Sequence, residues 1–154
     1  MEGAELIRAF GERIGLGLEL DDSGSCAFSS DGITITMTAL EELESIALTA
    51  DLGNPPPEKP DILYRQMLEA NYLFNATAGA TLSINGENGH ACLCSLFPCR
   101  TAVAEEFFAA AERFASVCEA WFKIVANYRW RVENDSSGPE ADPFRGLGTD
   151  FLRV

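Results

Sequence analysis

The sequence predicts an α+β domain with three helices and one five-stranded antiparallel sheet, in the order α-β-β-β-α-β-β-α. Two observations lead to this prediction. Apolar residues recur every three or four positions in three segments, as on one face of a helix, and every second position in five shorter segments, as on one face of a strand. The strand segments also follow one another in a run of three and a run of two, which favours an antiparallel sheet with helices packed on it.

A short amphipathic helix is predicted at residues 4–14. Leu6, Phe10 and Ile14 fall on one side of this helix, whereas most of its charged residues fall on the other. Gly15 then ends the helix, because glycine readily adopts the left-handed conformation that follows many helix C-termini.

Three antiparallel strands are predicted within residues 26–52. A tight turn at residues 30–32, with the sequence Ser-Asp-Gly, joins the first two strands. Glu41, Glu42 and Glu44 mark a solvated connection to the third strand. Threonines alternate with apolar residues in the second strand, so one face of the sheet need not be buried. The alternating apolar positions are Cys26, Phe28, Ile33, Ile35, Met37, Ile46, Leu48 and Ala50.

The second helix is predicted to start at Pro60. Residues 55–57 are three prolines that end the third strand, because proline lacks the amide N–H that a central strand needs. Proline at the first position of a helix is favourable, since the N–H there would have no partner within the helix. The apolar stripe of this helix is Leu63, Met67, Ala70 and Phe74.

Two strands and a long helix complete the predicted domain. Residues 82–84 and 92–97 alternate as strands do, and residues 85–89 form the turn between them. Thr101 is expected to cap the last helix. The stripe of that helix steps by three and four through Phe107, Ala111, Phe114, Cys118, Trp121 and Val125, and is widened by Phe108, Ala115 and Phe122.

One domain is expected over residues 1–131, because 154 residues with 47% hydrophobic content suffice for a single core. The run from Asn134 to Pro139 breaks every periodicity. Residues 132–154 are therefore expected to form a flexible or fold-back tail, with Phe144 and Phe151 among its few apolar points.

The charge of the chain argues against nucleic-acid binding. Eleven Lys and Arg residues face 24 Asp and Glu residues, which gives a net charge of −13 that repels phosphate backbones. The chain starts with acidic residues and contains no long apolar run, so neither a signal peptide nor membrane insertion is expected. Five cysteines without a Cys-x-x-Cys pair fit reduced thiols in the cytoplasm.

The one cluster with potential chemistry contains the only histidine. In a strand, His90, Cys92 and Cys94 would all point to one face, so a metal site or a Cys/His nucleophile is conceivable. Zinc knuckle spacing is missing, however, and the sequence indicates no Asp or Asn that would support the histidine. Buried structural thiols are therefore the preferred interpretation, with no catalytic residue, no metal and no cofactor.

Several short strings in a fixed order resemble the type III secretion chaperone family, the Tir-chaperone-like or CesT-like group that serves individual effectors. The most specific strings are Leu68-Glu69-Ala70-Asn71 and, after it, Gly79-Ala80-Thr81-Leu82-Ser83-Ile84. The resemblance covers about residues 4–128. Supporting strings are Ile14-Gly15-Leu16, Asp22-Ser23-Gly24-Ser25-Cys26, and Phe114-Ala115 through Trp121.

The resemblance implies a cytoplasmic bacterial homodimer that binds an extended N-terminal segment of a secreted effector and keeps it competent for export, without catalysis. A secretion-system ATPase is a further candidate partner. The residues expected to face the effector are Leu6, Phe10, Ile14, Leu16, Phe28, Ile33, Ile35 and Met37. Those expected in the dimer interface are Leu63, Met67, Asn71, Phe74, Leu82 and Ile84. This division predicts that Phe10→Asp abolishes effector capture and leaves the dimer intact.

Two alternatives stay open from the sequence. The first is a regulatory domain of similar α+β fold that holds another protein or a small apolar ligand, which an enclosed pocket would favour. The second is a metal protein or enzyme that uses His90 with the cysteines, which bound metal would favour.

Overall fold

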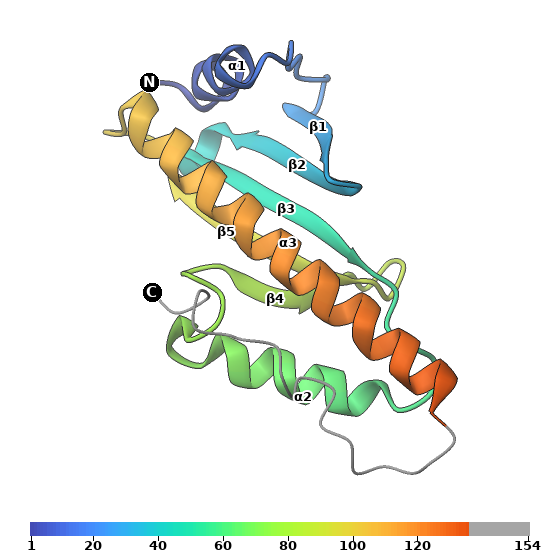
Figure 1. Cartoon of the computed structure of the whole chain (residues 1–154). Coiled ribbons are helices and arrows are strands. Elements are labelled where there is room, and N and C mark those ends of the chain that lie inside the picture. The colour runs from blue at the N-terminus through green and yellow to red at the C-terminus, as the bar shows by residue number, and fades with distance from the viewer. Residues whose placement is uncertain (136–154) are drawn as a thin grey trace.

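The structure, a computed structural model, describes residues 1–135 and confirms the predicted fold class. Its five strands form one antiparallel sheet in the order β1-β2-β3-β5-β4, so that β1 and β4 are the edge strands (Figure 1). No helix among the described residues is long and apolar enough to span a membrane. The elements are α1 Gly3–Ile14, β1 Ser25–Ser30, β2 Ile33–Leu40, β3 Ser45–Gly53, α2 Pro60–Asn71, β4 Thr81–Ile84, β5 Ala91–Pro98 and α3 Ala104–Asn134, with 3-10 turns η1 Glu41–Leu43 and η2 Tyr72–Phe74.

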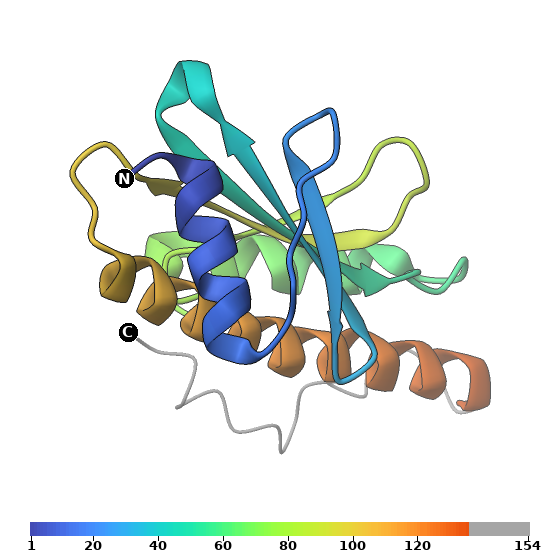
Figure 2. The same ribbon diagram turned by 90° about the horizontal axis from the view of Figure 1, so that it is seen from above.

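The helices are distributed unevenly around the sheet. α3 runs along one face of the sheet and α1 lies across the N-terminal part of α3, whereas α2 lies beside the edge strand β4 (Figures 1 and 2). Ion pairs from Arg13 to Glu105 and Glu112 join α1 to α3. The opposite face of the sheet, which carries Thr36, Thr49 and Cys94, has no helix of residues 1–135 packed on it.

The register of the strands explains which face is buried. Met37 pairs with Leu48, and Ala50 pairs with both Ile35 and Leu93, so these side chains point to the face under α3. All five are at most 2% exposed. Because side chains alternate along a strand, the threonines between them point to the opposite face, as the sequence predicts.

The turn between β1 and β2 has the predicted position. Ser30 pairs with Ile33, which leaves Asp31 and Gly32 as a two-residue loop. Their φ angles are 51° and 80°, the left-handed values that a type I′ turn needs. Asp and Gly are among the residues that adopt these values most easily.

An aromatic cluster joins α1, α3 and the sheet. The Phe10 ring lies with its centroid 6.2 Å from Phe28, 6.0 Å from Phe107 and 5.9 Å from Phe108. Phe97 of β5 lies 5.2 Å from Phe107. Such tilted and edge-on arrangements are favourable for aromatic rings. Phe10 therefore anchors α1 to the core together with Leu6 and Ile7, which are both fully buried.

Two predicted boundaries differ from the structure. Thr101 does not cap α3, because residues 99–102 form a turn in which the Ala102 N–H donates to Cys99 O, and the helix starts after Val103. There Glu106 accepts a hydrogen bond from the Val103 N–H at 3.2 Å. α3 also continues to Asn134, past the predicted end of the domain at residue 131. Residues 136–154, which make up most of the predicted tail, lie outside the described part of the chain.

Candidate protein-binding surfaces

Large apolar side chains that remain exposed are the first candidates for contact with other proteins. Single exposed apolar residues are ordinary, but a contiguous group of them marks an interaction surface. In this chain they gather on α2 with η2 and on the segment after α1. The exposed large apolar residues are Met1, Ile14, Leu16, Leu43, Leu68, Tyr72, Leu73, Phe74, Ile84, Leu96, Val103 and Trp130.

The outward face of α2 and the turn after it form one surface, which we call the α2 surface and define as Tyr64, Leu68, Tyr72, Leu73 and Phe74. Tyr64, Leu68 and Tyr72 follow one another in steps of four and so share one side of the helix. Leu68 is 69% and Tyr72 73% exposed. Leu73 and Phe74 have φ angles of 52° and 54°, uncommon for bulky residues. Strained backbone of this kind is concentrated at functional sites, which favours binding as the role of this surface.

The structure divides the residues predicted for the dimer interface between core and surface. Leu63, Met67 and Leu82 are at most 4% exposed because they pack inside the monomer. Ile84 is 41% and Phe74 51% exposed. The prediction that Phe74 lies on the helical stripe of Leu63, Met67 and Ala70 is wrong, because the helix ends at Asn71 and Phe74 belongs to η2.

Asn71, the sixth of these residues, holds the edge strand β4 within the monomer. Its Nδ2 donates a hydrogen bond to Leu82 O at 3.0 Å, and the Leu82 N–H donates to Asn71 Oδ1 at 2.9 Å. The side-chain amide therefore pairs with Leu82 as the backbone of a neighbouring strand would. This satisfies two polar groups that an edge strand otherwise leaves open.

The residues predicted to face an effector are also divided between the core and the surface of the monomer. Ile14 and Leu16 are 39% and 42% exposed, and Phe28 is half-buried against Phe10. The remaining five are at most 5% exposed and belong to the core: Leu6, Phe10, Ile33, Ile35 and Met37. We call Ile14, Leu16, Phe28 and the adjoining edge of β1 the α1–β1 surface. Within residues 1–135, β1 pairs only with β2, so its other edge is free of strand partners.

A close backbone contact fixes Leu16 in its exposed position. The Leu16 N–H donates to Gly11 O at 2.8 Å, which folds the segment after α1 back against the helix. A Cβ atom on residue 11 would lie 2.6 Å from Leu16 O, so only glycine permits this approach. Leu16 is thus presented by ordered backbone.

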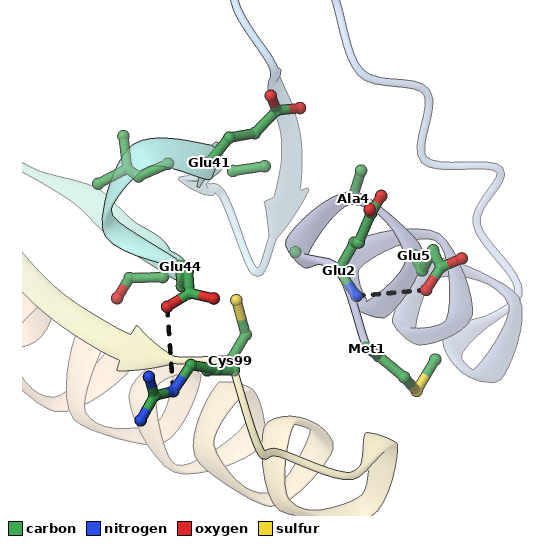
Figure 3. Close-up of a pocket in the computed structure, with 12 residues that line it drawn as sticks. Met1, Glu2, Ala4, Glu5, Glu41, Glu44 and Cys99 are labelled. Carbon is green, nitrogen blue, oxygen red and sulfur yellow. Dashed lines mark hydrogen bonds and ion pairs between the residues drawn. The ribbon is translucent and has the colours of Figure 1, made fainter.

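An acidic hollow of about 620 Å³ lies at the N-terminus of α1 (Figure 3). We define it by the carboxylates of Glu2, Glu5, Glu41 and Glu44 together with the Cys99 side chain. Glu5 accepts a hydrogen bond from the Glu2 N–H at 3.2 Å, as in a capping box. Among residues 1–135, the only side-chain base that lines the hollow is Arg100, which lies 3.9 Å from Glu44. The hollow therefore has a negative field.

His90 lies on the helix-free face of the sheet and has a partner that the sequence did not indicate. Its Nδ1 is 2.8 Å from Oδ2 of Asp51, a residue of β3 that is distant in sequence. The prediction that no acid supports the histidine is therefore wrong, because the register of β3 and β5 places Asp51 opposite Cys92. Within residues 1–135, no group of three or more His, Cys, Asp and Glu side chains could hold a metal ion.

The five thiols are free and differ in burial. Cys26, Cys99 and Cys118 are buried, and burial raises the pKa of Cys118 to about 12. Cys92 and Cys94 are half-exposed, so the prediction that they are buried thiols is wrong. The reason is that successive side chains of β5 point to opposite faces of the sheet, and Ala91 and Leu93 are the ones that point to the core. Loss of solvation also raises the pKa of the Cys92 thiol. Cys92 and Cys118 are thus mainly protonated, and poorly nucleophilic, at neutral pH.

Comparison with known proteins identifies the family. The model of the Tir chaperone protein (CesT) family matches residues 5–122, which span α1 to the middle of α3. The chain belongs to the CesT family. The resemblance to the secretion chaperones that the sequence suggested is thereby confirmed. No curated protein sequence matches this CesT-family chain.

Solved structures share the fold of this CesT-family chain at low sequence identity. The ExsC–ExsE complex gives a TM-score of 0.67 at 23% identity, over 79% of this chain and 92% of that one. The HopA1–SchA chaperone–effector complex gives a TM-score of 0.63 at 20% identity, over 77% of this chain and 91% of that one. The heterodimeric ExoU–SpcU complex from the type III secretion system of Pseudomonas aeruginosa gives a TM-score of 0.61 at 20% identity, over 78% of this chain and 95% of that one.

The contact between α2 and β4 in this CesT-family chain gives a first testable prediction. We expect Asn71→Ala to lower the free energy of unfolding by about 1–3 kcal/mol, because the Leu82 N–H and C=O lose their partners at a half-buried site. Urea unfolding followed by circular dichroism measures the loss, and amide hydrogen exchange at Leu82 should accelerate. Asn75→Ala is the matched control, since Asn75 is exposed. Equal effects of the two substitutions would contradict the role assigned to Asn71.

Proposed function

We propose that this protein is a chaperone that binds an extended N-terminal segment of a type III secreted effector and keeps it soluble and competent for export. The match of residues 5–122 to a chaperone family carries the proposal. It is supported by chains of the same fold whose structures are complexes of a chaperone with an effector. The two exposed apolar surfaces of this chain are suited to hold polypeptide.

The proposal includes a homodimer formed through the α2 surface. An isologous interface needs a patch that is complementary to itself. Two α2 helices packed antiparallel about a two-fold axis meet this need, because Leu68 is the centre of the stripe and Tyr64 and Tyr72 flank it symmetrically. The interface would bury the two most exposed side chains of this surface, Tyr72 and Leu73, which are 73% and 78% exposed in the monomer.

The effector segment would bind at the α1–β1 surface. An extended peptide adds to a sheet edge through main-chain hydrogen bonds and places alternate side chains in neighbouring hollows. The free edge of β1 offers the hydrogen-bonding groups, and Ile14, Leu16 and Phe28 offer apolar contacts beside it. The five core members of the predicted effector patch would act only indirectly, by holding this surface in place.

The same proposal makes the chain a non-enzymatic carrier in the bacterial cytoplasm, with a secretion-system ATPase as a further candidate partner. The raised pKa of Cys92, caused first by loss of solvation, is unfavourable for a nucleophilic role. The net charge of −13 favours solubility while the apolar surfaces stay exposed.

Effector capture can be tested with a substitution at the surface. We expect Leu16→Asp to prevent co-purification of the protein with a co-expressed secreted protein from the same organism, because a carboxylate would have to be desolvated in the apolar contact. The unfolding midpoint should stay close to that of the native chain, since Leu16 is 42% exposed.

Leu96→Asp is the matched control. Leu96 is 57% exposed and lies on β5, where β2 and β3 separate it from the edge strand β1. Capture should survive this substitution. Capture that resists Leu16→Asp and is lost with Leu96→Asp would move the binding site to the helix-free face, and a native chain that captures no secreted protein would refute the proposed function.

A further inference from the structure

The outer edge of β1 presents backbone hydrogen-bonding groups at every second residue. In an antiparallel pair, residues that exchange hydrogen bonds with the partner strand alternate with residues whose N–H and C=O groups point away from it. Ser30 and Ile33 flank a two-residue loop, so they form a hydrogen-bonded pair. The Ala39 N–H donates to Gly24 O at 2.9 Å, which agrees with this alternation at the other end of the hairpin. The residues of β1 whose backbone groups point outward are therefore Ser25, Ala27 and Ser29.

Asp21 closes the first of these outward positions. Its Oδ1 accepts a hydrogen bond from the Ser25 N–H at 3.0 Å, and its own N–H donates to Ser25 O at 2.8 Å. Both outward groups of Ser25 are thus occupied, as they would be by a neighbouring strand. The same Oδ1 accepts hydrogen bonds from the Ser23 hydroxyl at 2.6 Å and from the Ser23 N–H at 2.9 Å. These bonds, first that of the Ser23 hydroxyl, lower the pKa of the Asp21 carboxyl, so it stays ionised as an acceptor at neutral pH.

The edge of β1 beyond Ser25 is open. Ala27 and Ser29 are exposed, and within residues 1–135 no group hydrogen-bonds to their outward N–H and C=O. At the opposite edge of the sheet, by contrast, Asn71 pairs with both outward groups of Leu82. Proteins usually shield the edges of their sheets, because an unpaired edge pairs readily with another chain. The open stretch of β1, which we define as Ala27 and Ser29, is therefore a short site for one added strand.

The side chains beside the open stretch indicate which residues an added strand would carry. A residue opposite Phe28 points to the same face of the sheet as Phe28. Phe28 is half-buried against Phe10, with ring centroids 6.2 Å apart. Ala27 and Ser29 pair with Thr36 and Thr34, so their side chains point to the helix-free face. The open stretch thus matches a segment in which one apolar residue lies between two residues that can be polar.

We propose that Asp21 fixes the register of the bound effector segment by closing the edge of β1 at Ser25, so that the segment pairs with Ala27 and Ser29 and places one apolar side chain against Phe28. This inference rests on the proposed function and adds to it the position and the residue pattern of the bound segment. Asp21 is a positioning residue, because it acts through Ser25 and does not itself touch the segment.

Amide hydrogen exchange, followed by NMR on the full-length ¹⁵N-labelled protein, tests the inference. The protein is measured alone and in complex with the secreted protein that it captures on co-expression. In the free protein we expect slow exchange at Ser25 and fast exchange at Ala27 and Ser29. In the complex, exchange at Ala27 and Ser29 should slow about tenfold or more, because their N–H groups become hydrogen-bonded. Exchange at Ser25 should stay slow.

Asp21→Ala tests the positioning role. Asp21 is exposed, so the variant should still fold. Its Ser25 N–H loses its partner, and we expect fast exchange at Ser25 in the free variant. In the complex of this variant, exchange at Ser25 should slow about tenfold, because the segment can now extend to this residue. Asp21→Asn keeps an Oδ1 acceptor and should behave as the native chain does. Asp22→Ala is the matched control, since Asp22 is an exposed acid next in sequence and does not bond to Ser25.

Ala27→Pro tests the open stretch without a change at Asp21. Proline removes the outward N–H of residue 27, and it is tolerated on an edge strand where that N–H faces solvent. The dissociation constant of the effector complex should rise about tenfold, because a carbonyl of the bound segment loses its partner.

Four outcomes would overturn the inference or the function beneath it. Exchange at Ala27 and Ser29 that a bound effector leaves unchanged would overturn the inference and leave the proposed function standing, as would native affinity in Ala27→Pro. Fast exchange at Ser25 in the complex of Asp21→Ala would show that Asp21 does not set the register. A folded Asp21→Ala chain that captures no effector would assign Asp21 to binding itself, against the role proposed. A native chain that captures no secreted protein would refute the proposed function, and the inference with it.

Discussion

Leu68→Asp is expected to convert a dimer of about twice 16.7 kDa into a monomer. Leu68 would lie next to its own copy at the two-fold axis, so one substitution places two carboxylates in the centre of the interface. Truncation of a single residue at such a centre commonly costs about 2 kcal/mol or more of binding free energy. Because the loss counts twice here, about 4 kcal/mol in all, the dissociation constant should rise roughly 1,000-fold. Light scattering coupled to size-exclusion chromatography over a range of concentrations measures this change.

Leu43→Asp is the matched control for the dimer. Leu43 is 64% exposed, close to the 69% of Leu68, but it lies in η1 at the turn between β2 and β3. The Leu43 variant should remain dimeric. If both variants stay dimeric, the dimer is formed by another face, and if the native chain is a monomer at all concentrations, the homodimer proposal fails without affecting the family assignment.

Phe10→Asp is expected to unfold the protein, in contrast to the selective loss of effector capture that the sequence predicts. Phe10 is 5% exposed and lies within about 6 Å of three other phenylalanine rings. Truncation of a phenylalanine in such a position costs about 3–5 kcal/mol, and an unpaired carboxylate there adds its own cost of desolvation. The free energy of unfolding of most small domains is only about 5–15 kcal/mol, so these losses remove a large part of it.

The contrast between Phe10 and Leu16 tests whether the assignment of core and surface is right. Circular dichroism should show loss of the cooperative transition in urea for Phe10→Asp, whereas Leu16→Asp should unfold close to the native midpoint. Phe10→Leu is a milder variant that keeps the site apolar and should retain a cooperative transition at a lower midpoint. A stable, cooperatively folded Phe10→Asp chain would show that the aromatic cluster is not required for folding.

The periodicity of the sequence was sufficient to predict the fold, and the short strings at fixed spacing were sufficient to suggest the family, because both are local features of the chain. Alternation in β2 and β3 gave the strands, and the Asp31-Gly32 turn fixed the register of the first pair. The stripe on the last helix gave α3 with its buried Phe107, Phe114 and Trp121. Periodicity marks one apolar face of an element, however, and cannot say whether that face meets the core or a partner.

This ambiguity explains the differences at the candidate sites. The family resemblance assigned Leu6 and Ile35 to a partner surface, whereas they are buried in the core of the monomer at 0% and 2% exposure. Leu68 and Tyr72 are the best candidates for an interface, and they lie on the exposed side of α2, away from its buried residues. Too few residues on that side are apolar for the sequence pattern to indicate an interface. The positive φ angles at Leu73 and Phe74 have no signal in the sequence at all.

The sequence by itself therefore determined the order of elements, the antiparallel sheet and membership of the CesT family, because these follow from local propensity and from strings at fixed spacing. Only the tertiary structure decided which apolar residues remain exposed for contact with partners. It also decided that Asn71 hydrogen-bonds to the edge strand β4, that Asp51 contacts His90, and that four glutamates from the N-terminus of α1 and from η1 with the residue after it surround one hollow. Each of these depends on segments distant in the chain, whose approach is set by packing of the whole core and not by the pattern within any one segment.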